Sequence, residues 1–313
     1  MLLLTGATGL VGSALLPRLL AEGEPVRCLV RDPRRLGAQR VRVQIALGDL
    51  TDPPSFRNAL RGVHTVVHLA ASIRDQPRGS IEELNGIATW RMVEAAERQG
   101  VERFVFFSVL GASTHHRTRL LRAKALAERA VREAKLRTIV FAPSIVYAPG
   151  DPWLRLLERM SWLPLMPVSG RGHAHFQPIW AEDVADCVVA ALRADAAVVA
   201  VDDLPAPGSA VARDRDAARR ARYELAGPET LSHSEMVHVA LRSLGRVRPL
   251  AHVPTPVVSR GLRLVERAMG PSAFATWDEA ELMESSMTCA RGCADAQVLG
   301  VRPQRMAAVL GGC

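Results

Sequence analysis

A glycine-rich stretch at the start of the chain, Met-Leu-Leu-Leu-Thr-Gly-Ala-Thr-Gly-Leu-Val-Gly over residues 1–12, constrains the fold more than any other feature. The apolar run over residues 1–4 predicts a buried strand, and apolar residues at helical spacing after Gly12 predict a helix. Gly6 suits a tight turn, Gly9 lets a pyrophosphate approach the backbone, and Gly12 lets the helix pack closely on the strand. The N–H groups of the helix start would face the phosphates. This predicts a dinucleotide site at Gly6, Thr8, Gly9, Leu10, Val11 and Gly12, with a structural glycine turn as the alternative.

Strand-like and helix-like segments then alternate through the first 150 residues. Strands are predicted over residues 26–30, 41–46, 65–69, 103–108 and 138–142, and helices over 85–99 and 120–134. This alternation is typical of a doubly wound parallel sheet, so we expect an α/β, Rossmann-type domain over residues 1–150, completed by about 176–200. Residues 151–175 and 223–313 are expected to form a smaller C-terminal α/β lobe for a substrate or partner. Residues 202–222, rich in Pro, Ala, Gly, Asp and Arg, predict a mobile insertion.

The ends of the predicted strands carry the remaining candidate contacts, because ligands of open parallel sheets collect at the carboxyl ends of the strands. Arg31, helped by Arg34 or Arg35, follows the second strand, where an arginine suits a ribose 2′-phosphate and an acidic residue suits a free 2′-hydroxyl. We therefore predict NADP(H) rather than NAD(H), with an ordinary basic loop as the alternative. Asp49 is placed to accept from an adenine amino group, whereas His68 is predicted to pack within its apolar run. The other predicted cofactor contacts are Leu50, Leu69, Ala70, Ala71, Pro143, Ser144, Ile145 and Val146.

Composition and charge exclude several classes of protein. The five cysteines form no dense disulfide framework and no metal-ligand pattern, which favours a reducing compartment and no bound metal. No apolar run reaches the length of a membrane span, and a strand at residue 1 leaves no room for a leader. We therefore expect a cytoplasmic protein, at most peripheral at the inner face of a membrane. The net charge of +8 suits a phosphate-bearing cofactor or an anionic surface, but without a nucleic-acid-binding motif we expect no nucleic-acid partner.

Several segments together resemble a known family. The glycine stretch, Gly-Asp-Leu at 48–50, His-Leu-Ala-Ala at 68–71, and Asn85 with Thr89 are similar to the extended or atypical short-chain dehydrogenase/reductases. Two later segments, Phe-Gln-Pro-Ile-Trp-Ala-Glu-Asp-Val-Ala at 176–185 and Tyr-Glu-Leu-Ala-Gly-Pro-Glu at 223–229, resemble the branch that contains the NAD(P)-binding accessory subunit of respiratory complex I and its bacterial relatives. The resemblance covers residue 1 to about 310 except 202–222. It implies association with a respiratory complex or a membrane.

The same resemblance implies a catalytic pattern, from which this sequence departs. In the family, a tyrosine four residues before a lysine relays a proton to a substrate carbonyl. The lysine would be Lys124, which would also bind the nicotinamide ribose, and Ser108 would polarise the carbonyl. Leu120 stands four residues before Lys124, and a leucine can neither donate nor accept a proton. His115 and His116 precede that helix and are alternative acids at neutral pH, although the absence of a visible partner favours an exposed polar loop.

The sequence leaves two functions open. The first is an NADP(H)-binding protein without ordinary dehydrogenase turnover, with a structural, assembly or sensing role. The second is an NADPH-dependent reductase, isomerase or dehydratase that acts on a hydrophobic or quinone-like carbonyl substrate through another proton donor, since Ser108 and Lys124 are present. Consumption of NADPH with a carbonyl or quinone acceptor would separate the two.

Overall fold

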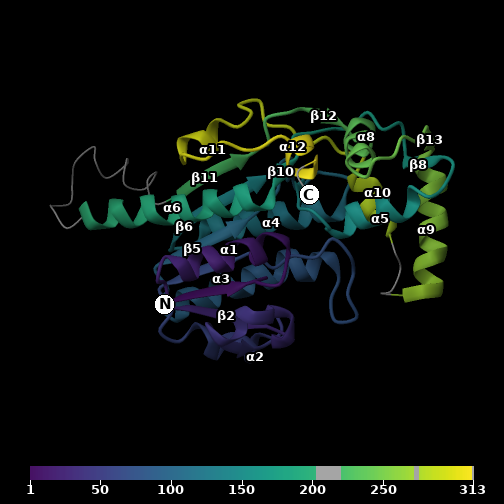
Figure 1. Cartoon of the computed structure of the whole chain (residues 1–313). Coiled ribbons are helices and arrows are strands. Elements are labelled where there is room, and N and C mark those ends of the chain that lie inside the picture. The colour runs from purple at the N-terminus through teal and green to yellow at the C-terminus, as the bar shows by residue number, and fades with distance from the viewer. Residues whose placement is uncertain (202–219, 271–274, 312–313) are drawn as a thin grey trace.

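Seven parallel strands form the central sheet of the computed structural model, which describes residues 1–201, 220–270 and 275–311 (Figure 1). Their order is β3–β2–β1–β4–β5–β6–β11, so the chain leaves β1 toward one edge and later returns to β4 on its other side. Ligands of such sheets bind beside this reversal point. The strands are β1 (Leu2–Thr5), β2 (Val26–Val30), β3 (Gln44–Leu47), β4 (Thr65–His68), β5 (Arg103–Phe107), β6 (Arg137–Pro143) and β11 (Arg220–Leu225).

Helices cover both faces of this sheet. On β5, Val105 and Phe107 pack on the side of α1 and α6, and Phe104 and Phe106 pack on the side of α2, α3 and α4. This alternation follows the two-residue period of a strand, and burial of both faces is typical of a parallel sheet. The predicted doubly wound α/β architecture is confirmed. The covering helices are α1 (Leu10–Ala21), α2 (Pro53–Arg57), α3 (Ala88–Arg98), α4 (Arg119–Glu133) and α6 (Ala181–Val201), with the 3-10 helices η1 (Pro33–Val41) and η2 (Asn58–Leu60) and the π-helix η3 (Glu83–Ile87).

Two smaller apolar clusters hold the C-terminal lobe together. One includes Phe176 and Met287, and the other includes Met166 and Leu241. Short strand pairs join its segments: β7 with β10, β9 with β12, and β8 with β13. The elements are β7 (Val146–Tyr147), α5 (Pro152–Met160), β8 (Met166–Ser169), β9 (His175–Phe176), β10 (Ile179–Trp180), β12 (Leu231–Ser232), α8 (His233–Ser243), β13 (Leu250–Val253), α9 (Thr255–Met269), α10 (Trp277–Leu282), α11 (Ala294–Val298) and α12 (Met306–Gly311).

The third strand is shorter than the sequence predicts. It begins at Gln44 rather than at residue 41, because Pro33 starts the turn η1. The Asp32 carboxylate accepts from the Arg34 N–H at 3.0 Å and fixes the start of that turn. Residues 33–41 therefore form a compact turn before the chain enters the sheet.

The last strand lies in a different place from the one expected. The strand predicted at Tyr223 begins at Arg220 and extends the main sheet beside β6, instead of standing in the C-terminal lobe. The half-buried Tyr223 ring stacks on the buried Phe141 of β6 with the ring centres 5.5 Å apart. Of the predicted insertion 202–222, residues 202–219 lie outside the described part of the chain, and residues 220–222 begin β11.

Candidate functional site

The glycine-rich loop between β1 and α1 folds tightly at the reversal point of the sheet. Gly6 has a φ of +74°, and a Cβ there would lie 2.7 Å from the Ala70 nitrogen after β4. A Cβ on Gly12 would lie 2.1 Å from the Gly6 carbonyl oxygen, so α1 can approach the loop only because residue 12 is glycine. The Gly9 N–H donates to the same oxygen at 2.9 Å. The loop is thus held against residues 69–70.

The N-terminus of α1 is open to a ligand. Its N-cap is Gly9, which is exposed and supplies no side-chain cap to the first turn. The N–H groups of that turn have no acceptor within the helix, and the positive end of the helix dipole lies there. Thr8, Leu10 and Val11 around it are half-buried. An approachable backbone at an uncapped helix start fits the pyrophosphate of a dinucleotide.

A buried chain of hydrogen bonds positions the segment that faces this loop. The His68 ring bonds through Nδ1 to the Thr5 hydroxyl at 2.9 Å and through Nε2 to the Thr89 hydroxyl at 3.2 Å. Burial is the main cause that lowers the pKa of His68 to about 3, so the ring is neutral. The Asn85 amide accepts from the Ser72 N–H at 3.2 Å and donates to the Ser72 carbonyl at 2.7 Å. His68 is thus a packed residue, as predicted, and the network fixes both ends of the segment Leu69, Ala70 and Ala71.

The ends of β2 and β3 form a second part of the site. The Gly48 N–H donates to the Val30 carbonyl at 3.2 Å, which brings the residues after the two strands together. Arg31 is exposed there. One carboxylate oxygen of Asp49 accepts from both the N–H and the hydroxyl of Thr51 at 3.0 Å. Leu50 packs partly against the apolar core on the α3 face.

Two candidate catalytic residues meet on the α4 face at the end of β5. Lys124, which is 5% exposed, donates from Nζ to the Phe107 carbonyl at 2.6 Å and lies 4.9 Å from the centre of the Phe106 ring. Burial lowers the pKa of Lys124 to about 8. The buried Ser108 hydroxyl donates to a Glu128 carboxylate oxygen at 2.5 Å. Lys124 and Ser108 therefore lie in one region, but the polar end of each already has a bond inside the protein.

Glu128 is a site residue that sequence reasoning missed. It lies four residues after Lys124, so the spacing puts both on one face of α4, and this signal was available. Its side chain is 5% exposed, and besides Ser108 it accepts from Arg222 of β11 at 3.0 Å. Glu128 therefore ties α4 to the end of β5 and to the middle of β11.

An apolar side chain stands on α4 at the position where the sequence predicts the missing proton donor. Leu120, one helical turn before Lys124, is half-buried. Of the alternative acids, His115 is exposed, and His116 bonds through Nδ1 to the Thr118 hydroxyl at 2.9 Å in the turn before α4. Burial, aided by two neighbouring arginines, lowers the pKa of His116 and so disfavours its protonated form.

The turn after β6 serves in part as an anchor for the C-terminal lobe. The buried Ser144 hydroxyl donates to the Met287 carbonyl at 2.6 Å and accepts from the Gln177 N–H at 3.0 Å. Pro143 is buried at the end of β6, while Ile145 and Val146 are half-buried. The Ser144 side chain is therefore engaged in contacts between segments of the protein.

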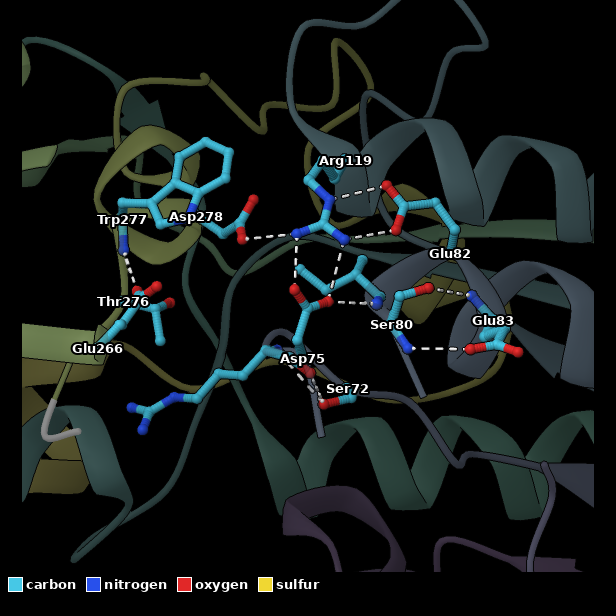
Figure 2. A network of polar contacts seen from close by, with 12 residues as sticks. Ser72, Asp75, Ser80, Glu82, Glu83, Arg119, Glu266, Thr276, Trp277 and Asp278 are labelled. Atoms are coloured by element: carbon cyan, nitrogen blue, oxygen red, sulfur yellow. Dashed lines mark hydrogen bonds and ion pairs between the residues drawn. The ribbon is translucent and has the colours of Figure 1, made fainter. Parts of the chain in front are cut away.

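An arginine at the start of α4 joins the sheet domain to the C-terminal lobe (Figure 2). The Arg119 guanidinium bonds to Glu82 at 2.6 Å, to Asp75 at 3.0 Å and to Asp278 of α10 at 3.2 Å. The hydrogen bond from Arg119 lowers the pKa of Glu82 to about 2, whereas burial raises the pKa of Asp278 to about 6 despite the same arginine. No sequence signal links these residues, because up to 203 positions separate them.

None of the helices in the described part of the chain is both long and apolar enough to cross a membrane. Within the same residues, no group of three or more His, Cys, Asp or Glu side chains is arranged to hold a metal ion.

The geometry so far defines a nucleotide-binding α/β protein, and comparison with known proteins names its family. A family model described as NAD(P)H-binding matches residues 6–195, which is more than half of the chain. The chain therefore belongs to the NAD(P)H-binding family, within the extended short-chain dehydrogenase/reductases.

Individual relatives differ in what their names say. The chain is 28% identical over 263 residues to the mitochondrial NADH dehydrogenase (ubiquinone) 1 alpha subcomplex subunit 9 of Arabidopsis thaliana, which covers 80% of this chain and 60% of that protein. It is 30% identical over 192 residues to a ceramide reductase of Caulobacter vibrioides, covering 61% of this chain and 60% of the relative. The matches thus span three fifths of each relative. The solved NADPH complex of the quinone oxidoreductase QOR2 of Escherichia coli shares the fold, with a TM-score of 0.70 at 14% identity over 100% of this chain and 99% of that one.

Proposed function

We propose that this protein binds NADP(H) in a structural, assembly or sensing role and does not carry out the usual proton-coupled hydride transfer of its family. One observation carries the proposal. On α4, the residue one turn before Lys124 is Leu120, and the Lys124 amine is buried and donates to the Phe107 carbonyl at 2.6 Å. The glycine loop and the uncapped start of α1 offer backbone groups for the pyrophosphate of a dinucleotide. The residues at α4 and the end of β5 offer no positioned proton donor.

The chemistry explains why this one position matters. A nicotinamide cofactor, when bound, supplies or accepts hydride. Reduction of a carbonyl also needs a proton at the carbonyl oxygen, from a group within hydrogen-bond reach. Leu120 has no proton to give, and the Ser108 hydroxyl is already donated to Glu128. The predicted contact of Lys124 with the nicotinamide ribose stays a prediction.

The preference for NADP(H) rests on Arg31. It is exposed after β2, beside the residues that follow β3. A guanidinium there can pair with a ribose 2′-phosphate through charge-assisted hydrogen bonds. The family model and the solved neighbour support a nucleotide cofactor in general, so the phosphate preference is carried by Arg31 alone.

The names of the relatives point to two kinds of role. One is named as a subunit of a respiratory dehydrogenase and another as a reductase. We propose the role of a subunit or assembly protein, in which the nucleotide-bound domain docks on a larger assembly. The cytoplasmic location stays a prediction.

The test combines nucleotide binding with turnover on one preparation. Nucleotide is released from the purified protein by denaturation and identified by mass, and the emptied protein is titrated with NADPH and NADH. We expect NADPH to bind and not to be consumed with a panel of quinones and aldehydes. Steady NADPH consumption by the unaltered protein would overturn the structural role, and no binding of either nucleotide would overturn the site.

A matched pair of variants tests the position on α4. Leu120→Tyr restores a hydroxyl one turn before Lys124, and Leu126→Tyr puts the same hydroxyl on an exposed part of the same helix. Turnover gained only by Leu120→Tyr would show that the missing hydroxyl is what prevents catalysis. Equal turnover in both variants would mean that Leu120 does not hold the proton-donor position.

One observation favours the alternative, an NADPH-dependent reductase, isomerase or dehydratase on a hydrophobic or quinone-like carbonyl. The hydroxyl of Ser108 and the carboxylate of Glu128 are 2.5 Å apart at the carboxyl end of β5, and such a pair can hold a proton. If the unaltered protein consumes NADPH and Ser108→Ala does not, with NADPH affinity retained, this pair is the non-standard donor and the alternative replaces the proposal above.

A further inference from the structure

Two segments of the C-terminal lobe carry positive charge with no acidic residue among them. Residues 159–181 and 236–265 contain seven arginines and no aspartate or glutamate. The rest of the chain sums to a net charge of +1, because the net charge of the whole protein is +8, although residues 27–42 also carry six arginines and one aspartate. The seven are Arg159, Arg171, Arg242, Arg246, Arg248, Arg260 and Arg263.

The fold brings these two segments side by side. Strand β8 pairs in parallel with β13, so the chain before each strand lies against the other. The Arg246 guanidinium lies 3.9 Å from the centre of the Trp162 ring and also bonds to the Ser161 hydroxyl. Arg248 donates to the Ser161 carbonyl at 3.1 Å. We call residues 159–165 and 242–248 the basic tip, and they lie at the end of the molecule where α5, β8 and β13 meet (Figure 1).

Large apolar side chains of the basic tip face solvent. Trp162 is 75% exposed, Leu163 47%, Leu165 52% and Val247 80%. Single exposed apolar residues are common, but a tryptophan, two leucines and a valine in two adjacent loops form a patch of the kind that marks an interaction site. Among arginines, such a patch combines the two features by which peripheral proteins bind membranes: apolar side chains that enter the interface and cations that pair with anionic headgroups.

We propose that the basic tip docks on a lipid surface that carries anionic headgroups. Trp162 and its neighbouring leucines enter the headgroup layer, where tryptophan is favoured, while the arginines pair with lipid phosphates. A second copy of the chain is a poor occupant, because a symmetric contact would bring arginine against arginine with no acidic residue in either segment. The docking surface would give the proposed assembly role a place to act, but it stands on residues separate from the nucleotide site.

The test is sedimentation of the full-length protein with vesicles. One set is pure phosphatidylcholine and the other contains about one third phosphatidylglycerol, because each arginine near an anionic surface contributes about fivefold in binding. We expect binding to the anionic vesicles only, and release when salt is raised from about 0.1 M to about 1 M, where the Debye length falls to about 3 Å. Equal binding to both sets, or no binding to either, would overturn the proposal.

A matched pair of double variants locates the surface. Trp162→Ala with Arg246→Glu should weaken vesicle binding at least tenfold, whereas Trp90→Ala with Arg98→Glu should change it less than twofold. Trp90 is also exposed but lies on α3. Equal loss in both pairs would show that the basic tip is not the contact. An NADPH titration of each variant confirms folding, and it separates a failure of this surface from a failure of the nucleotide site.

A third variant and a competitor complete the test. Val247→Glu alters only a side chain that is 80% exposed, so it should weaken vesicle binding without unfolding the protein. Soluble poly-glutamate distinguishes lipid from an acidic protein partner. If it binds as tightly as the vesicles and Trp162→Ala has no effect on either, the surface belongs to an acidic protein and the lipid proposal is wrong.

Discussion

The carboxyl edge of the sheet is built differently on the two sides of β4. On the β1 side, the functional groups are backbone atoms, left accessible by glycines and by an uncapped helix. On the β5 side, they are side chains: those of Lys124 and Ser108 are bonded inside the protein, and Leu120 stands one helical turn before Lys124, where we propose that the proton donor is missing. Dinucleotide binding at the glycine loop needs a backbone without side chains in the way, whereas proton transfer needs a side chain that carries the proton. A single residue can therefore remove the second function and leave the first intact.

The largest effect is expected from breaking the β1 side at Gly12. Gly12→Ala places a methyl group 2.1 Å from the Gly6 carbonyl, so α1 must shift away from the loop. We expect a loss of about 1–3 kcal/mol or more in unfolding free energy, typical of overpacking, and loss of nucleotide binding. Chemical denaturation and NADPH titration measure the two effects.

Gly261→Ala is the matched control for that variant. Gly261 lies within α9, and nothing lies within 4 Å of the position that an added methyl group would take, so alanine should stabilise the helix by about 0.5–1 kcal/mol. If Gly12→Ala behaves like this control, the close approach of α1 to the loop does not support the site.

The second-largest effect is expected at Arg31, on the β1 side, and it tests whether the site prefers NADPH to NADH. Arg31→Asp replaces a guanidinium that can pair with a 2′-phosphate by a carboxylate that repels it. We expect NADPH affinity to fall by about 10- to 100-fold, since a hydrogen bond between charged groups contributes about 1.5–3 kcal/mol, and NADH affinity to change little. Arg98→Asp is the control. Arg98 is the last residue of α3, near the amino ends of the strands and away from their carboxyl edge, and it pairs with Glu94 in an exposed position. Equal loss of NADPH and NADH would show that Arg31 does not recognise the phosphate.

The β1 side could be predicted from the sequence almost completely. The glycine spacing, the apolar strand and the helix that follows are local features, and each depends on residues within about twenty positions. The doubly wound parallel class also follows, since alternating strands and helices admit few topologies, but the order of the strands is not predicted. The strand at Arg220 could be expected but not placed, because its partner β6 lies about eighty residues earlier and pairing over that distance leaves no local pattern.

The β5 side could be predicted only in part. Lys124 and Leu120 are set by helical spacing, which the sequence shows directly. The sequence does not show that the Lys124 amine bonds to a backbone carbonyl, because a main-chain acceptor has no sequence signature. The same holds for Arg119, whose partners come from two distant segments, residues 75–82 and α10. Ion pairs between remote segments depend on the tertiary fold, so neither composition nor periodicity predicts them.

The third effect tests whether Lys124 contacts the bound cofactor or serves only as a buried side chain of the protein interior. Burial lowers its pKa to about 8, below the ordinary 10.5, so between these values the unfolded chain binds more protons than the folded one. Stability should therefore rise as pH increases from 8 to 10.5, by about 3 kcal/mol, and Lys124→Met should lack this rise. The exposed Lys135→Met is the control. If NADPH affinity in Lys124→Met stays within about threefold of the original, Lys124 belongs to the protein interior and the predicted contact with the ribose is wrong. A tenfold loss would assign Lys124 to the cofactor and narrow the contrast between the two sides.

The smallest effect concerns the contact that joins the β5 side to the C-terminal lobe. Burial raises the pKa of Asp278 to about 6, against the attraction of Arg119 and with the repulsion of Asp75, Glu266 and Glu281. Between pH 3.8 and 6 the folded protein therefore binds more protons than the unfolded chain, and the contribution of Asp278 to stability falls as pH rises through this range. Asp278→Asn removes the ionisation but leaves an amide oxygen for Arg119, so it should lack this decline, which amounts to about 2 kcal/mol after allowance for partial exposure.

Urea denaturation of the original and of Asp278→Asn at pH 4, 5, 6 and 7 measures this difference, with the exposed Asp52→Asn as control. The two curves should separate above pH 4 and run parallel above pH 6. Glu82 in the same network acts with the opposite sign, because its hydrogen bond with Arg119 lowers its pKa to about 2, and its contribution is lost only as pH falls from 4.5 toward 2. A constant difference from pH 4 to 7 would mean that Asp278 is ionised throughout, and that the join between the two parts of the molecule is an ordinary ion pair rather than one weakened by burial.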